Sequence, residues 1–285
     1  MSKSLRRPDM SKFCVFIFSW GNPSIEDTFN SLRRAGYTGR IIHLLDDLDQ
    51  TRFEYMKKYG EENCYVFNKH FVSRRCDPMN NFGGLESTLY VEHAMFDAAK
   101  ELGFDYFVSM CHDYYYFGYR GEDGAKKTTR MDEVFEAMVT YLINSPVKCI
   151  AFSQGGDNMG GFNVDKLCKR KVMNSFFCKT SDPFPFFGSM NDDCNMYVQN
   201  GIRGDIFLTI MRFQLDQGDT QSNDDGLANL YKSYGTYVKS FYTVMLSPSS
   251  VRIALMGTKA TRLHHRIDYK KTVPCILSET FKKQE

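Results

Sequence analysis

Short apolar segments alternate with helical patterns from residue 13 to about residue 153, and this alternation constrains the fold more than any other feature. The apolar segments are rich in β-branched or aromatic residues, as buried strands are, and span residues 13–18, 40–45, 64–68, 105–110 and 148–153. The intervening segments carry helix start or stop signals and span residues 24–35, 51–59, 87–102 and 131–143. The alternation predicts an α/β fold with a mostly parallel central sheet flanked by helices.

The second half of the sequence is less regular, with many aromatic and amide side chains. Its patterns predict a helix over about residues 220–234 and a strand over residues 237–246. No repeat, low-complexity tract or linker divides the chain. Because 285 residues, 42% of them hydrophobic, can bury one large core, we expect a single domain over residues 1–285.

Composition argues against a membrane protein, a zinc ribbon and a disulfide-stabilised protein. The first residues, MSKSLRRPDMSK, are polar, and no apolar run reaches the roughly 18 residues needed to cross a bilayer. The nine cysteines form no CxxC pair, and an odd number cannot all pair within the chain. We therefore expect a soluble protein of a reducing cytoplasm, with no membrane and no evident protein partner. A net charge of +2 does not by itself indicate nucleic acid, although the basic cluster Lys126, Lys127 and Arg130 could contact phosphates or be solvated surface.

Polar residues follow the predicted strands where they end, at the edge where open α/β sheets bind ligands. These ends are residues 19–22 (Ser-Trp-Gly-Asn), residues 46–49 (Asp-Asp-Leu-Asp), Asn68-Lys69 and Cys111-His112-Asp113. The phosphate-binding patterns GxxxxGK[ST] and GxGxxG are absent from the expected positions. A diphosphate ligand would therefore need another counter-charge, such as a divalent metal held by one or two side chains.

Asp113 and His112 are candidate ligands for that metal. The carboxylate of Asp113 is a hard oxygen ligand held at a strand end, and His112 could add a nitrogen or orient a water. Alternatively, Asp113 caps a turn and His112 packs among the tyrosines that follow.

Two further clusters could take part in chemistry. Asp192 and Asp193 are adjacent carboxylates among apolar residues, an arrangement that can raise one pKa toward the range of a general base, or that can cap a helix start. His264 and His265 are surface residues, or one of them completes the metal site that Asp113 begins.

The order of these pieces resembles a known family. The segments IIHLLDDLDQT, FNKHFVSRRCDPMNNF and YYYFGYR resemble the nucleotide-sugar half of a GT-A glycosyltransferase. Together with MNDDCNMYVQNGIRGDIFLT and HHRID, they resemble the bacteriophage glycosyltransferases associated with TET-type hydroxylases, which glycosylate hydroxymethylated pyrimidines in phage DNA. The resemblance covers about residues 13–275. It implies a GT-A-like domain with a nucleotide-sugar-binding half (about 13–153) and an acceptor-binding and catalytic half (about 154–275).

The resemblance also implies a UDP-sugar donor and assigns candidate roles. Asp46 and Asp47 would meet the uracil or ribose, residues 19–22 would line the same pocket, and Asp77 would approach the nucleotide or sugar. The full set of donor-binding candidates is Ser19, Trp20, Gly21, Asp46, Asp47, Lys69 and Asp77.

The metal-binding motif departs from the family's pattern. Asp113 matches the last aspartate of the family's DxD, but the usual Asp-Asp-Asp-Tyr reads Cys111-His112-Asp113-Tyr114 here. The loss of two carboxylates should weaken the binding of Mn2+ or Mg2+ or shift the contacts of the donor sugar. His264 or His265 could partly compensate.

The resemblance implies transfer of a sugar from the UDP-sugar to the hydroxyl of a 5-hydroxymethylpyrimidine, above all 5-hydroxymethylcytosine, in double-stranded or locally opened phage DNA in the host cytoplasm. Asp192 or Asp193 would take the acceptor proton. Aromatic side chains could stack on an extruded base or simply pack; they are Tyr114, Tyr115, Tyr116, Phe184, Phe186 and Phe187. Two alternatives are a transferase acting on a glycan, lipid or protein, and a non-catalytic protein that binds nucleotide sugars or DNA. The sugar, and inversion or retention at its anomeric carbon, stay open.

Overall fold

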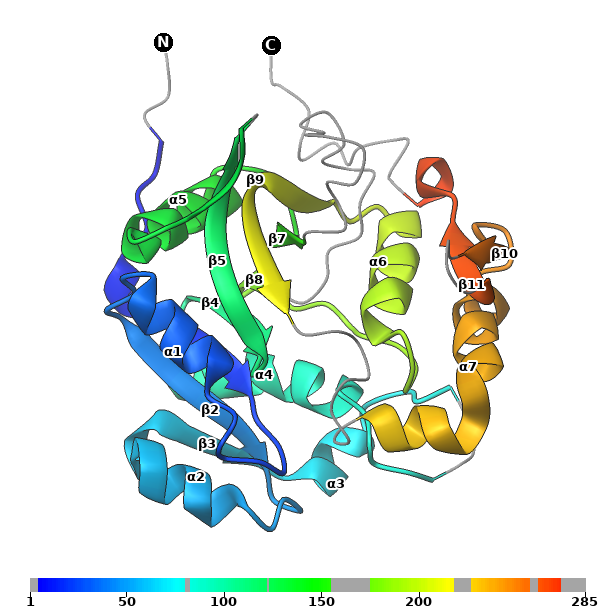
Figure 1. Ribbon diagram of the computed structural model, residues 1–285, viewed down its shortest axis with the longest axis horizontal. Coiled ribbons are helices and arrows are strands. Elements are labelled where there is room, and N and C mark those ends of the chain that lie inside the picture. The colour runs from blue at the N-terminus through cyan, green and yellow to red at the C-terminus, as the bar shows by residue number, and fades with distance from the viewer. Residues whose placement is uncertain are drawn as a thin grey trace.

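The computed structural model describes residues 5–79, 83–121, 123–154, 175–217, 227–256 and 261–272. Its centre is one large sheet with helices on both faces (Figure 1). In spatial order the strands are β3 (Cys64–Phe67), β2 (Arg40–Asp46), β1 (Phe13–Phe18), β4 (Tyr106–Cys111), β8 (Ser175–Lys179), β7 (Cys149–Gln154), β9 (Phe207–Gln217), β5 (Tyr114–Gly121) and β6 (Gly124–Lys127). All of these strands except β5 and β8 run in the same direction. The predicted α/β fold with a mostly parallel sheet is confirmed.

The helices divide between the two faces of the sheet. They are α1 (Asp27–Arg34), α2 (Arg52–Tyr59), α3 (Lys69–Ser73), α4 (Leu89–Glu101), α5 (Met131–Ile143), α6 (Asp192–Ile202) and α7 (Leu227–Leu246). Helices α4 and α6 pack in one hydrophobic core, and α1 and α5 pack in the other. Within the described residues, no helix combines the length and the apolar character that crossing a membrane requires.

The central strands are buried on both sides. In β1, Phe16 faces the core beneath α4, whereas Val15 and Ile17 face the core beneath α1 and α5. Successive side chains of a strand point to opposite faces, so a strand covered on both faces must be apolar throughout. This is the physical reason that the unbroken apolar segment at residues 13–18 predicted a strand.

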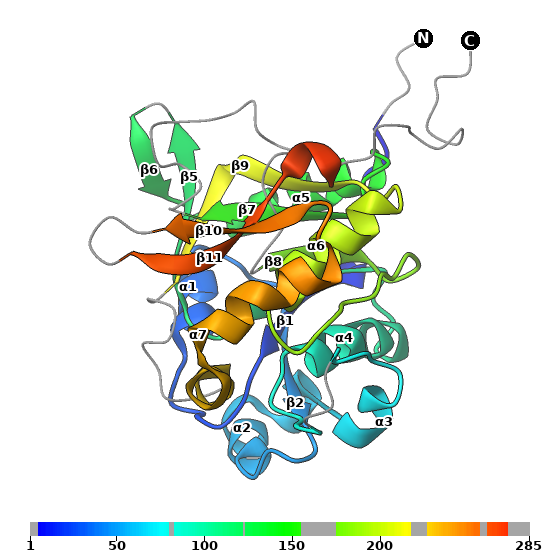
Figure 2. The same cartoon turned by 90° about the vertical axis from the view of Figure 1, so that its right-hand side faces the viewer.

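A small antiparallel ribbon lies beside the main sheet. Strands β10 (Val251–Met256) and β11 (Arg262–Ile267) pair with each other and contact α7. Figures 1 and 2 show α7 and the ribbon together on one side of the molecule, next to α6.

The second half of the chain was predicted poorly. The strand predicted for residues 237–246 is wrong, because this segment forms the end of α7. Its exposed side chains, Tyr237, Phe241 and Met245, recur every four residues, and the buried Ser240 and Thr243 lie between them, which is a helical period. Residues 220–226 of the predicted helix lie outside the described residues. Strands β8 and β9 were not predicted.

Gly201 in α6 provides a test of the packing between the C-terminal segment and the core. A Cβ at this position would lie 2.0 Å from the carbonyl oxygen of Thr272. We expect Gly201→Ala to lower the free energy of unfolding by about 1–3 kcal/mol, because a backbone atom must move. Chemical denaturation measures this loss. The control is Gly121→Ala, whose nearest neighbouring atom would be 3.9 Å away and which should leave the free energy of unfolding nearly unchanged.

Candidate active site

The polar loops after β1, β2 and β3 meet at one edge of the sheet. The backbone N–H of Gly21 donates to Asp49 Oδ2 at 3.0 Å. Lys69 Nζ lies 2.7 Å from Asp46 Oδ2 and 4.5 Å from the centroid of the Trp20 ring. Because the three strands are parallel, their carboxyl ends lie at the same edge. The structure thus brings together donor-binding candidates from all three loops.

The acidic side chains after β2 are held by donors of the protein itself. Asp46 and Lys69 form a buried ion pair, with side chains that are 6% and 8% exposed. Asp47 accepts hydrogen bonds from the backbone N–H of Lys69 at 2.9 Å and from the Asn68 side chain at 2.7 Å. These contacts join the loop after β2 to the start of α3. Contact of either acid with a nucleotide stays a prediction.

Ser19 contacts a histidine that sequence reasoning missed. Its hydroxyl lies 2.9 Å from Nδ1 of His43 and 3.3 Å from the carbonyl oxygen of Ile17. Burial lowers the pKa of His43 to about 4, so the ring is neutral at physiological pH, and it stacks on Tyr59 with centroids 3.9 Å apart. The only sequence signal was a histidine inside the apolar segment RIIHLL.

His112 and Asp113 occupy the turn between β4 and β5. His112 Nδ1 lies 3.3 Å from the carbonyl oxygen of Phe18. A carbonyl oxygen only accepts hydrogen bonds, so this contact requires the proton on Nδ1 and leaves the lone pair on Nε2. Asp113 is half-buried. The pair can therefore offer one nitrogen and one carboxylate to a metal ion.

Thr28 in α1 fixes this turn and was not predicted from the sequence. Its hydroxyl donates to the carbonyl oxygen of Cys111 at 2.7 Å and accepts from the backbone N–H of Tyr114 at 2.8 Å. The side chain therefore bridges the end of β4 and the start of β5, on either side of His112 and Asp113.

Asp192 and Asp193 form the start of α6. Asp192 is 7% exposed, and its carboxylate accepts hydrogen bonds from the Thr88 hydroxyl and the backbone N–H of Asp193. The carboxyl group of Glu92 interacts with the same carboxylate. Burial, together with the charge of Asp193, raises the pKa of Asp192 to about 6. Asp193 is half-buried and accepts from the backbone N–H of Cys194 at 2.7 Å. Both acids lie where free N–H groups of a helix stabilise negative charge.

Asn191 links the start of α6 to α7. Its backbone has φ of +53°, a conformation that asparagine tolerates better than most residues. Its side-chain amide donates to the carbonyl oxygen of Lys239 at 2.7 Å and to the Thr243 hydroxyl at 3.2 Å. The position of Asp192 and Asp193 therefore depends on packing against a helix from much later in the chain.

The two adjacent histidines lie on β11 and pack against α6. The ring of His265 is buried, with Nδ1 3.5 Å from Asn191 Nδ2 and Nε2 3.3 Å from Cys194 Sγ. His264 Nδ1 lies 2.7 Å from the carbonyl oxygen of His265, and the two ring centroids are 4.3 Å apart. The structure thus joins this motif to the acidic start of α6.

Asp77 belongs to the same side of the site. Its carbonyl oxygen accepts from the backbone N–H of Gly188 at 3.0 Å, and its carboxylate accepts from Met79 N–H at 2.8 Å. The next carbonyl, that of Pro78, accepts from Ser189 N–H at 3.1 Å and from the Tyr242 hydroxyl at 2.5 Å. Asp77 therefore lies beside the segment that leads into α6.

Electrostatic interactions link the β4–β5 turn to α6. Burial raises the pKa of the Cys111 thiol, and the carboxyl groups of Asp113, Glu92 and Asp192 raise it further. Cys111 therefore lies within electrostatic range of acids from the turn, α4 and α6. Among the described residues, no group of three or more His, Cys, Asp or Glu side chains is arranged to hold a metal ion.

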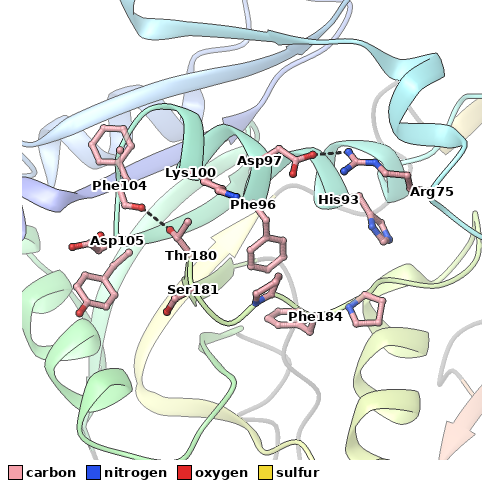
Figure 3. A pocket seen from close by; sticks show the side chains of 14 residues that line it. Arg75, His93, Phe96, Asp97, Lys100, Phe104, Asp105, Thr180, Ser181 and Phe184 are labelled. Carbon is pink, nitrogen blue, oxygen red and sulfur yellow. Dashed lines mark hydrogen bonds and ion pairs between the residues drawn. The ribbon is translucent and has the colours of Figure 1, made fainter.

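The large cavity drawn in Figure 3 lies away from these residues. Its volume is about 880 Å³, and it is bordered by α4, the start of β4 and the segment after β8 (Figure 3). Arg75 and Asp97 form an ion pair of 2.5 Å at its rim. The cavity borders the first residues of β4, whereas Asp113 follows the last residue of β4. The cavity and Asp113 therefore lie at opposite ends of this strand.

Comparison with known proteins identifies the family. The model of the TET-associated glycosyltransferases matches residues 13–226, and no curated protein matches the chain. Among solved structures, the chain is similar to glucosyl-3-phosphoglycerate synthase from Mycobacterium tuberculosis in complex with Mn2+, UDP and phosphoglyceric acid (10% identity, 90% of each chain covered, TM-score 0.46). It is also similar to the mannosyltransferase PcManGT from Pyrobaculum calidifontis in complex with GDP-Man and Mn2+ (10% identity, 82% of this chain and 64% of that chain, TM-score 0.48).

The match to the family model covers most of the chain, and it confirms that the protein is a glycosyltransferase. The chain belongs to the TET-associated glycosyltransferase family.

The buried ion pair of Asp46 and Lys69 gives a test of how the donor loops are held. We expect Lys69→Met to destabilise the protein by about 3–5 kcal/mol, because Asp46 is left buried without a counter-charge. Denaturant titration measures the effect. The double variant Asp46→Asn/Lys69→Met should recover part of the loss. In the control, Lys58→Met breaks the more exposed pair with Glu26, where about 0–1 kcal/mol is expected.

Proposed function

We propose that this glycosyltransferase transfers a sugar from a UDP-sugar to the hydroxyl of a 5-hydroxymethylpyrimidine in DNA. The family match carries the proposal, since the family is named for its association with TET-type enzymes. The geometry supports it, because the polar loops after β1, β2 and β3 lie at the edge of the sheet where β4 ends in His112 and Asp113. The sugar donor and the side chains of the β4–β5 turn would therefore lie at the same edge of the sheet.

The donor nucleotide would bind over the loops after β1 and β2. The Trp20 ring is 37% exposed and offers a face to the base, while Lys69 fixes this ring from beneath. Asp47, half-buried at the same edge, is our candidate for the ribose. Both acids accept hydrogen bonds from the protein, and we choose Asp47 because it is the more exposed of the two, whereas Asp46 is buried in its ion pair with Lys69.

A divalent cation would be held by Asp113, with Nε2 of His112 as a second ligand. The carboxylate of Asp113 suits Mn2+ or Mg2+, which accept few protein ligands and take the others from phosphates and water, whereas the His112 nitrogen is the softer of the two donors. When bound, the cation would neutralise charge on the UDP leaving group. We leave His264 and His265 out of this ligand set, because His265 contacts Asn191 and Cys194 at the start of α6 and His264 contacts the backbone of His265.

Asp193 is our candidate for the catalytic base. Asp192 is buried, accepts two hydrogen bonds and interacts with Glu92, so its carboxylate has little freedom to approach an acceptor. Asp193 is more exposed and lies next to it at the helix start. It would take the proton from the acceptor hydroxyl as the oxygen attacks the anomeric carbon.

A basic and aromatic surface on β5, β6 and β9 supports DNA as the acceptor. Tyr115 and Tyr119 are 52% and 43% exposed. Arg212 donates to the Tyr119 hydroxyl at 2.7 Å, and Lys126 is the cross-strand neighbour of Tyr119. Exposed rings and cations suit a polyanion with stackable bases. Strand β5 begins one residue after Asp113, so this surface extends from the proposed reaction centre.

The other aromatic candidates differ in exposure. Tyr114, Phe184 and Phe186 are buried and belong to the two hydrophobic cores. We assign these rings to packing, and Tyr115 to contact with an extruded base.

The activity itself is tested by supplying UDP-sugars and DNA that contains 5-hydroxymethylcytosine. Mass analysis of the nucleosides should detect a glycosylated base with the wild type. Asp193→Asn should lower turnover by about 100-fold or more, the usual contribution of a general base, while UDP still binds. Asn is nearly isosteric with Asp, so the fold is kept. Transfer to a glycan or protein but not to DNA, or unchanged turnover in Asp193→Asn, would contradict the proposal.

Binding of DNA gives a separate test of the β5–β6 surface. The double variant Lys126→Glu/Lys127→Glu should weaken DNA binding and reduce the slope of log K against log salt by about one unit per lost phosphate contact. Fluorescence anisotropy over a range of salt concentrations measures both. Lys57→Glu/Lys100→Glu is the matched control, since it changes the net charge equally on α2 and α4, away from β5 and β6. Equal weakening in the two double variants would contradict the assigned surface.

A further inference from the structure

Glu92 is a buried acid on α4 that the proposed reaction does not use. It is 4% exposed, and among the described residues its Oε2 atom has no hydrogen-bond partner. The same face of α4 contributes Leu89 and Met95 to a hydrophobic core. A carboxyl group in such a place is costly unless it is neutral or hydrogen-bonded.

Glu92 and Thr88, at the start of α4, both contact Asp192 of α6. They are four residues apart, which places them on one face of the helix start. The Thr88 hydroxyl donates to Asp192 Oδ2, and the carboxyl group of Glu92 is hydrogen-bonded to Asp192. The opposite oxygen of Asp192, Oδ1, accepts the backbone N–H of Asp193 at 3.0 Å. The contact therefore runs from α4 through Asp192 to the backbone of the proposed base.

The hydrogen bond between Glu92 and Asp192 requires one proton. Among the described residues, the titratable groups whose charges act on Glu92 are Asp192 and Asp193 of α6, Cys76 after α3 and Cys111 of β4, and none of these four is a cation. Burial, followed by the charges of Asp192 and Asp193, raises the pKa of Glu92 well above its usual value. The hydrogen bond from Glu92 lowers the pKa of Asp192, which favours its ionised form. Both directions agree with a protonated Glu92 beside an ionised Asp192.

We propose that Glu92 is a positioning residue, which as a neutral acid donates a hydrogen bond to Asp192 and thereby fixes the start of α6 and the aim of Asp193. This inference rests on the proposed function, in which Asp193 is the base. Asp192 is then an anchor between two helices, held by Thr88 and Glu92 on one side and holding the backbone of Asp193 on the other.

A pair of substitutions separates donation from simple filling of space. Glu92→Gln keeps a hydrogen-bond donor of nearly the same shape, so kcat should stay within about threefold of wild type. Glu92→Leu fills the space without a donor, and kcat should fall by about tenfold or more while the KM for the UDP-sugar is unchanged. Glu101→Gln, an exposed acid of the same helix, is the control and should have no effect. Equal kcat in the Leu and Gln variants would overturn the inference.

The pH dependence of stability tests the proton without any sugar transfer. A carboxyl whose pKa is raised on folding stabilises the protein fully below its unfolded pKa of about 4.3, and this contribution is lost as pH rises through the folded pKa. Glu92→Gln cannot ionise, so its Tm relative to wild type should increase from pH 5 to pH 8. A Tm difference that does not change with pH would overturn the assigned proton. If wild type transfers no sugar, the proposed function fails, yet this measurement still decides the protonation of Glu92.

Discussion

Carboxylates gathered at one edge of the sheet repel each other, and the structure depends on how each of them is held. Asp46 is neutralised by Lys69, Asp47 accepts from the backbone and side chain at the start of α3, and Asp49 accepts from Gly21 and from Thr51 at 2.7–2.8 Å. Each of these acids also ties one loop to another. The contacts that lower the electrostatic cost of the acids therefore shape the loops where the donor is proposed to bind.

At the start of α6, repulsion between carboxylates is lowered by a proton on Glu92. Among the described residues, none of the groups that shift the pKa of Asp192 is a cation, and the backbone N–H of Asp193 together with the Thr88 hydroxyl stabilises its charge. Glu92, which would be a second charge in the same place, is buried enough to stay neutral and become a donor. A cation opposite Asp192 would attract its carboxylate away from α4, whereas a neutral acid holds it without adding charge.

The sequence predicted the first half of the fold because its signals are local. Residues 13–18 and 131–143 were assigned with the bounds that the structure has, since burial on both faces makes a strand apolar throughout and a helix carries its own start and stop residues. The second half depends on tertiary contacts. Strand β9 pairs with β7 and β5. The apolar sequence at the end of α7 is typical of a strand. Its helical period becomes visible only when the structure shows which of its side chains are exposed.

The candidate site divides in the same way. The polar strand ends at residues 19–22, 46–49 and 112–113 were predicted because parallel strands bring their carboxyl ends to one edge. The residues that hold these strand ends, such as Thr28, His43 and Glu92, were missed. Each lies in a helix or strand without a distinctive local pattern, and its partner is distant in the sequence. His264 and His265 were found by their unusual pairing, but their contact with Asn191 and Cys194 required the position of β11.

The altered metal motif agrees with this distribution of charge. The resemblance described under Sequence analysis implies an aspartate at the position of Cys111, and Cys111 is within electrostatic range of Asp113, Glu92 and Asp192. A carboxylate at this position would add charge to a region where two acids already share one proton. The thiol avoids that cost, because burial and the neighbouring acids raise its pKa and keep it neutral. The substitution therefore fits a site in which Asp113 is the principal carboxylate of the turn and the start of α6 carries the remaining charge.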